Sequence, residues 1–284
     1  MRPAHRITSF TASALAVLAL STGITACGGA RAPASSTHAT PALRTGAPGT
    51  AGGEPLWLIS GSALRLIAAA PAARAALNRS STLVIVNSRG AGIPAHWAVR
   101  GILGFTSEAE LAKTVENGKV PASVFAVGYD NEAWNLTPSA ERADPAHYEA
   151  LAASVAAAHH LQYVQLGNLP AYGNPVYGAR YASFLDIQAQ SREKNPAIYA
   201  SYVRTEAAAA RKLNPAVVVI AGLSTNPPAG AVTAQELYAD VNSTRSYVDG
   251  YWLNIPSPGV ACPRCGLPEP GIAVGLLTLL DGAD

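Results

Sequence analysis

Short apolar runs of strand type recur along the chain from Leu56 onward, and most are followed by a segment with the apolar spacing of a helix. The expected strands are Leu56 to Ser60, Leu83 to Asn87, Ile102 to Phe105, Val124 to Asp130, Tyr163 to Gly167, Phe184 to Gln190, Val217 to Leu223 and Gly250 to Ile255. The expected helices are Ala63 to Leu77, Glu108 to Glu116, Pro145 to His159, Pro196 to Leu213, Thr233 to Val241 and Ile272 to Leu280. This alternation predicts a single (β/α)8 TIM barrel over residues 56–284.

Two connections in this pattern lack a clear helix. The segment from Ser88 to Gly101 reads as irregular, and the segment from Asn168 to Ala182 is rich in Gly, Pro and Tyr. A doubly wound open sheet with fewer strands also alternates strand with helix, and it remains the alternative fold. Because no Gly-rich phosphate-binding turn follows the first strand, a nucleotide-binding protein is disfavoured.

Three helix starts carry recognisable signals. Asp144 and Asn195 each precede a proline, which is the arrangement of an N-cap followed by proline at the first helical position. Thr233 with Glu236 three residues later reads as a capping box. These signals fix which strand ends face the same side of the barrel.

The stretch from Val124 to Trp134 is the expected centre of the site. Side chains alternate along a strand, so Val124, Asp130 and Glu132 are expected to share the face that points into the barrel, with Phe125 and Tyr129 packing outward against helices. The active sites of such barrels lie at the C-terminal ends of the strands. The simpler alternative is that the Asp caps a helix and the Glu is solvated in a loop.

Polar side chains are expected at the ends of many other strands, where a barrel interior would normally be apolar. Amides and carboxylates hydrogen bond to sugar hydroxyls, and an indole packs against the apolar face of a sugar ring. The pattern therefore favours a carbohydrate ligand. The expected substrate-binding residues are Asn131, Trp134, Asn87, Gln165, Gln188, Gln190, Asn226, Trp252 and Asn254.

Glycoside hydrolysis needs a carboxylic acid beside the leaving oxygen, with a pKa raised by burial or by a neighbouring carboxylate. Glu132 is the expected acid, and Asp130 is its expected electrostatic partner. No cofactor is expected.

Asp130-Asn131-Glu132 resembles the end of the Asp-x-Glu signature of the chitinase-like family 18 glycoside hydrolases. The resemblance implies that Glu132 is the general acid, that Asp130 positions an acetamido nucleophile of the substrate, and that Trp252 floors the sugar site. The earlier aspartates of the signature are replaced around Ala126 and Gly128.

Asn131-Glu132 is also similar to the acid/base pair of the large clan of retaining barrel glycosidases. That clan places its nucleophilic Glu on the seventh strand, where this chain has Ser224, Thr225 and Asn226. The chain as a whole resembles secreted barrel proteins of actinobacteria.

The N-terminal region reads as a targeting segment. Arg2 and Arg6 precede an apolar run that is too short to span a membrane, and the run ends in Ile-Thr-Ala-Cys27. This resembles a bacterial lipobox, which implies cleavage of residues 1–26 and lipidation of Cys27. A plain secretory signal is the alternative. Residues 27–55 have a composition typical of a disordered tether, so an extracytoplasmic, lipid-anchored protein is expected.

Charge and the remaining cysteines limit the other functions. The chain has 20 basic and 18 acidic residues, and loss of Arg2 and Arg6 leaves 18 of each. A neutral chain argues against nucleic acid as a partner, so contact with the membrane is expected through the lipid alone. Cys262 and Cys265 are expected to form a local disulfide, and a zinc site would need two further ligands, so no metal is expected.

The sequence favours a glycosidase-type hydrolase of the cell envelope. Two other functions stay open: a non-catalytic glycan-binding or scaffold lipoprotein with a barrel fold, and a thiol redox protein that uses Cys262 and Cys265.

Overall fold

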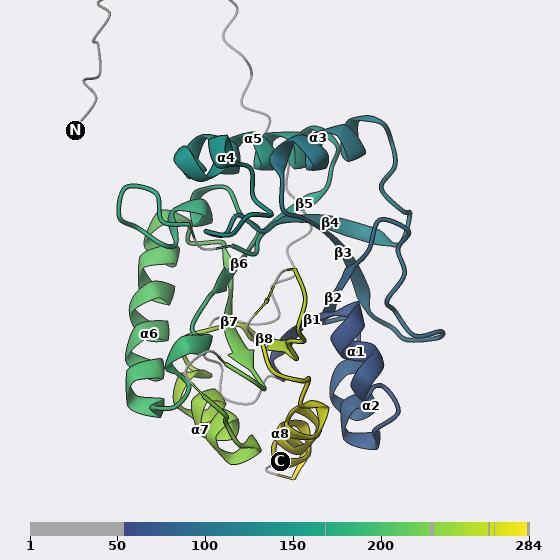
Figure 1. The fold of residues 1–284 in the computed structure, drawn as a ribbon, viewed down its shortest axis with the longest axis vertical. Helices are drawn as coiled ribbons and strands as arrows, with labels where there is room; N and C mark the ends of the chain where they lie inside the picture. Colours follow the sequence, from purple (N-terminus) through teal and green to yellow (C-terminus); the bar gives the residue numbers. More distant parts are fainter. Residues whose placement is uncertain (1–53, 168, 228–229, 261, 264, 283–284) are drawn as a thin grey trace, which may run out of the picture. The chain divides into compact units, whose positions relative to one another are not determined.

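The protein folds into a closed barrel of parallel strands surrounded by helices, as seen in a computed structural model that describes residues 54–282 except 168, 228–229, 261 and 264 (Figure 1). Each strand pairs in parallel with the next, and the last strand pairs with the first. The predicted (β/α)8 barrel is confirmed, and the open sheet is excluded. The strands are β1 (Leu56–Ser60), β2 (Thr82–Val86), β3 (Arg100–Phe105), β4 (Val124–Tyr129), β5 (Gln162–Gln165), β6 (Phe184–Ile187), β7 (Val218–Ser224) and β8 (Gly250–Asn254).

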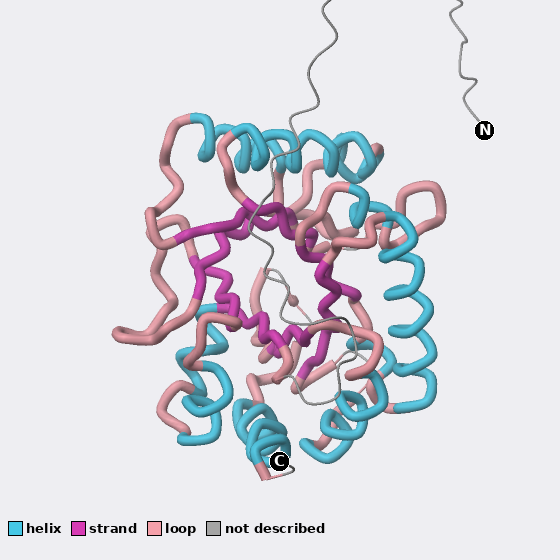
Figure 2. The backbone as a smooth tube through the Cα atoms, turned by 180° about the vertical axis from the view of Figure 1, so that it is seen from behind, coloured by secondary structure: helices cyan, strands magenta, loops and turns pink. Residues whose placement is uncertain are grey.

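Helices form a layer outside the strands (Figure 2). They are α1 (Gly61–Ile67), α2 (Pro71–Leu77), α3 (Glu108–Glu116), α4 (Ser139–Ala143), α5 (Pro145–Ala158), α6 (Pro196–Leu213), α7 (Ala234–Thr244) and α8 (Pro270–Asp281). The N-caps predicted at Asp144, Asn195 and Thr233 all accept a backbone hydrogen bond, and Thr233 forms the full capping box with Glu236.

Two features of the helical layer differ from the prediction. The single helix expected from Ala63 to Leu77 is two helices, because Pro71 lacks an amide hydrogen and begins α2 after a break. The short α4 was not expected. Strand β2 runs directly to β3 without a helix, and the 3-10 turns η1 (Tyr177–Arg180) and η2 (Gln190–Arg192) lie in the connections around β6.

Two sets of buried residues separate the layers. The larger apolar cluster includes Trp57, Ile59, Leu185, Ile187 and Tyr251, which face the helices. The residues that alternate with them on the strands are buried outside this cluster and fill the barrel interior. They include Leu58, Leu83, Ile102, Ala126, Val164, Phe184 and Ile220.

Strand β4 contains a bulge that changes the predicted alternation. Gly101 pairs with Val124, whereas Ile102 pairs with Ala126, so Phe125 is an extra residue in β4. Val124 therefore belongs to the helix-facing cluster, and the expectation that it faces inward is wrong. Phe125 packs edge-on against Phe184 with ring centroids 6.0 Å apart, and not outward as expected. Beyond the bulge, the predicted alternation is restored.

Residues 1–26 and most of the expected tether, including Cys27, lie outside the described residues. Among the helices that the structure describes, none is both long and apolar enough to cross a membrane.

Candidate functional site

Three carboxyl groups interact at the C-terminal ends of β4 and β6. Asp130 and Glu132 follow β4 directly, and Asp186 lies on the inward face of β6, between the outward Leu185 and Ile187. Burial raises the pKa of Asp130 and of Asp186; the charge of Glu132 adds to the rise for Asp130, and both β4 acids add to it for Asp186. The acids predicted on β4 are thus joined by a third carboxyl from β6.

Gln188 holds the carboxylate of Glu132. Its Nε2 donates to Oε1 of Glu132 at 2.7 Å and to the carbonyl of Leu166 at 2.9 Å. Burial raises the pKa of Glu132, while the hydrogen bond from Gln188 opposes this by stabilising the ionised form. Gln188 therefore fixes Oε1 of Glu132, and with it the orientation of the carboxyl group.

The other two acids are less well solvated. Asp186 is 2% exposed, and neither of its carboxyl oxygens has a hydrogen-bond partner among the described residues. Oδ1 of Asp130 is likewise buried and unpaired within that part of the chain. Burial is the main cause of the raised pKa of both groups. No Lys or Arg of the described chain forms an ion pair with these acids. Without a positive charge to offset burial, the carboxyl groups stay protonated to higher pH than carboxyl groups in water.

The loop that carries the two β4 acids is supported from the outside by buried glutamates. Asn131, between Asp130 and Glu132, donates from Nδ2 to Oε1 of Glu149 on α5 at 2.7 Å. Tyr163 donates its hydroxyl to the other oxygen of Glu149. Burial raises the pKa of Glu149 to about 8, against the lowering effect of both hydrogen bonds. Asn131 therefore faces the helical layer and positions its neighbours.

A second glutamate supports the end of β4 in the same way. Glu141 on α4 accepts from the hydroxyls of Tyr129 at 2.6 Å and Ser107 at 2.9 Å, and from the amide of Glu108 at 2.9 Å. This network is buried. It fixes the outer face of β4 immediately before Asp130.

Three of the residues predicted to bind substrate make structural contacts elsewhere. Gln165 is buried and donates to the carbonyl of Gly167 at 3.0 Å. Asn87 is exposed and accepts two amide hydrogens of its own turn. The indole nitrogen of Trp134 donates to Thr137 Oγ1 at 2.8 Å, which secures the loop after Glu132.

Three others lie around the barrel mouth near β7 and β8. The amide of Gln190 packs over Gly222, where an added Cβ would lie 2.4 Å from its Nε2. Trp252 pairs in register with Gly222 and faces inward, and its indole nitrogen is buried without a partner among the described residues. Asn254 is in register with Ser224 at the end of β8. Gly222 thus leaves room for an amide beside an inward indole.

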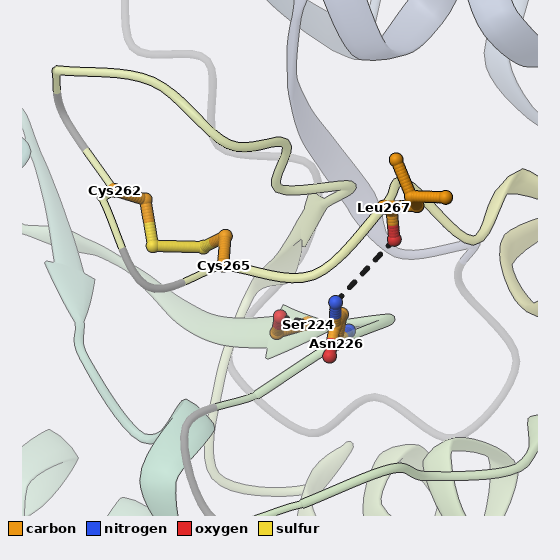
Figure 3. The surroundings of a disulfide bond; sticks show 5 residues. All are labelled: Ser224, Asn226, Cys262, Cys265 and Leu267. Atoms are coloured by element: carbon orange, nitrogen blue, oxygen red, sulfur yellow. Dashed lines mark hydrogen bonds between the residues drawn. A yellow bond between two sulfur atoms is a disulfide. The ribbon is translucent and has the colours of Figure 1, made fainter.

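The loop after β8 carries a disulfide between Cys262 and Cys265, whose Cα atoms are 5.3 Å apart (Figure 3). Asn226, at the end of β7, donates from Nδ2 to the carbonyl of Leu267 in that loop at 3.4 Å. Asn226 also donates its amide to Ser224 Oγ at 3.2 Å. Asn226 therefore connects the β7 end to the disulfide loop.

The arrangement suits proton transfer by a carboxylic acid. It brings together Asp130, Glu132, Gln188 and Asp186, whereas Asn131 and Gln165 face away from the interior. The site-residue prediction omitted Asp186, although the alternation of β6 places it on the polar face. It also omitted Glu149, which carries no local signal because it resembles a surface helix residue. Among the described residues, no group of three or more His, Cys, Asp or Glu is arranged to hold a metal ion.

No protein-family model matches the chain, and no curated protein sequence is significantly similar to it.

Proposed function

We propose that this protein is a glycoside hydrolase of the cell envelope in which Glu132 is the general acid. The observation that carries the proposal is the placement of Asp130, Glu132 and Asp186 at the ends of β4 and β6, where Gln188 of the β6 end holds Glu132 and burial raises the pKa of each acid. A glycosidase acid must hold its proton near neutral pH and release it to the leaving oxygen.

The contacts of each acid suggest its role. Gln188 occupies Oε1 of Glu132, so Oε2 is the oxygen that carries the proton to the glycosidic bond. Asp130 and Asp186, once one of them ionises, stabilise the positive charge that develops on the sugar. Trp252 offers an inward indole whose Nε1 has no partner in the described part of the chain, so it is suited to donate to a hydroxyl or acetamido oxygen.

The cellular setting belongs to the same proposal. Lipidation at Cys27 holds the barrel at the outer face of the cell membrane, and residues 27–55 let it reach the cell-wall glycan. The disulfide between Cys262 and Cys265 is compatible with an oxidising compartment.

The test is hydrolysis by the purified full-length chain across aryl glycosides and cell-wall glycans, with Glu132→Gln beside it. The variant keeps the shape and the acceptor for Gln188 but has no proton to transfer. We expect kcat/KM to fall by roughly 10²- to 10⁴-fold. Glu116→Gln, on the exposed end of α3, is the matched control. Unchanged hydrolysis by Glu132→Gln would contradict the assignment.

A non-catalytic glycan-binding protein is the second candidate. It is favoured by the end of β7, where Ser224, Thr225 and Asn226 provide no acid. In that case the wild type and Glu132→Gln would bind a glycan equally and neither would hydrolyse it.

A further inference from the structure

Three tyrosines form an aromatic cluster in the loop between β5 and β6. The rings of Tyr172 and Tyr177 have centroids 5.2 Å apart, and those of Tyr177 and Tyr181 are 6.3 Å apart, both edge to face. Tyr172 is 85% exposed and Tyr181 is 39% exposed. We call these three residues the tyrosine cluster. Solvent therefore reaches most of the first ring and part of the third.

The cluster is built on a rigid base. Val176, Ala179 and Ala182 of the same loop are buried in the helix-facing core. The guanidinium of Arg180 lies 5.3 Å from the centroid of Tyr177, at a distance that allows a cation–π contact. The rings are thus presented on fixed backbone, which limits the entropy lost when a ligand binds.

Tyr172 occupies a position that backbone preference disfavours. Ala171 and Asn174 exchange backbone hydrogen bonds, and the two residues between them, Tyr172 and Gly173, have φ of +55° and +73°. Such a two-residue turn favours Asn or Gly at both positions. A tyrosine there adopts a disfavoured conformation, and apart from its contact with Tyr177 its ring is exposed to solvent. This combination points to a ligand for the ring.

The cluster lies on the same face of the barrel as the carboxyl groups. The loop follows the C-terminal end of β5, and Leu169 at its start donates its amide to the carbonyl of Asn131 at 3.3 Å. The carbonyl oxygen of Leu166 accepts a hydrogen bond from Gln188 Nε2, the same nitrogen that donates to Glu132. Tyr172 is six residues beyond Leu166, so the chain between them spans at most about 20 Å.

We infer that the tyrosine cluster binds sugar units of a polymeric glycan beyond the unit held at the carboxyl groups. This inference rests on the proposed function, which places the first sugar unit at the carboxyl groups. Exposed tyrosine rings offer an apolar face to a pyranose and a hydroxyl to its oxygens. Residues 169–183 contain no Asp or Glu, so the cluster repels neither neutral nor acidic glycans. Because the cluster binds units beyond the one at the carboxyl groups, the substrate class is a glycan of several sugar units.

The test is affinity electrophoresis of the purified full-length chain in gels that contain glycol chitin, soluble peptidoglycan strands, arabinogalactan or glycogen. Tyr172→Asn removes the ring and places a residue that the left-handed turn favours, so the fold is kept. We expect its Kd for the glycan that retards the wild type to rise about fivefold to tenfold. Tyr172→Phe keeps the stacking ring, so it should bind within about twofold of the wild type.

The control is Ile198→Asn, which removes an exposed apolar side chain from α6. Wild-type affinity in Tyr172→Asn, or no retardation of the wild type by any of the four glycans, would overturn the inference. Hydrolysis is measured on the same samples with a short aryl glycoside, for which Tyr172→Asn should keep kcat/KM. Binding that depends on Tyr172 without any hydrolysis would reject the proposed catalysis alone and leave the cluster as a binding site.

Discussion

Nε2 of Gln188 lies 2.7 Å from Oε1 of Glu132, and this contact joins the ends of β4 and β6 across the barrel mouth. The same nitrogen is held by the carbonyl of Leu166 between them. The orientation of the proposed acid is therefore set by a neighbouring strand and not by its own loop alone.

Removal of this hydrogen bond should raise the pKa of Glu132 further, because the bond stabilises the ionised form. In Gln188→Leu, a general acid would stay protonated to higher pH, so the basic limb of kcat/KM should move to higher pH. We expect the rate below that limb to fall roughly tenfold from lost orientation. Gln190→Leu is the control for the pH profile, and a limb that moves to lower pH would refute the role of Gln188.

Asp186 should make stability depend on pH. Its folded pKa is raised, so its contribution to stability is full below the unfolded pKa near 3.9 and is lost as pH rises through the folded value. Asp186→Asn stays neutral and avoids this loss. Its Tm should exceed the wild-type Tm at pH 8, by about 3 °C for each kcal/mol gained, and the difference should shrink toward pH 4. Asp281→Asn, exposed at the end of α8, should show no such trend.

Glu193 and Asp240 form a second buried acidic pair, outside the proposed site. Oε1 of Glu193 accepts from the Ser224 amide at 2.6 Å, while its other oxygen and both oxygens of Asp240 have no partner in the described chain. Burial raises the pKa of Glu193 to about 9 and that of Asp240 to about 8. Their contribution to the free energy of unfolding is fully present below about pH 4, the pKa of such acids in the unfolded chain, and it is lost as the pH rises to about 9.

Glu193→Gln should therefore stabilise the protein at alkaline pH, because the amide keeps an acceptor for the Ser224 amide and carries no charge beside Asp240. We expect a gain of about 1 kcal/mol at pH 8.5 and little change at pH 4.5, measured by urea unfolding. Destabilisation by the same amount at both pH values would show that Glu193 does not titrate as described.

Loss of Glu149 should be costly, since Asn131 and Tyr163 would both be left with buried, unpaired donors. Glu149→Ala should lose about 2–4 kcal/mol of unfolding free energy, and Tyr163→Phe about 1 kcal/mol. Hydrolysis should fall in Glu149→Ala even where the protein is fully folded, because Asn131 positions the acids on either side of it. Exposed Glu116→Ala should change neither quantity, and equal stability of Glu149→Ala and the wild type would contradict the account.

The strands were predictable because each is a short apolar run that needs no knowledge of its partners. Strand β1 and the helices α3 and α6 were predicted with the bounds that the structure has. Strand β6 was expected to reach Gln190 but ends at Ile187, because the chain turns there into η2. The pattern of polar and apolar residues continues through that turn and hides the strand end.

The outer supports of the site were not predictable from local pattern. Glu141 and Glu149 lie on short or alanine-rich helices, where a glutamate is usually solvated. Their burial depends on Tyr129 and Tyr163, which come from strands and meet them only in the folded chain. The inward side of β6, by contrast, was readable from alternation, and Asp186 follows from it.

The pairing of β8 with β1 closes the barrel, and it is expected to form late in folding. Gly250 lies opposite Leu56, and a Cβ on it would come 2.2 Å from the Leu56 carbonyl oxygen, so only glycine lets these strands close. The contact joins the first and last strands and has the greatest sequence separation of any strand pairing here. Contacts between segments far apart in the sequence form slowly, so barrel closure is expected to be a slow step of folding. Until β8 is available, β1 and β7 each present an open strand edge to any other chain nearby.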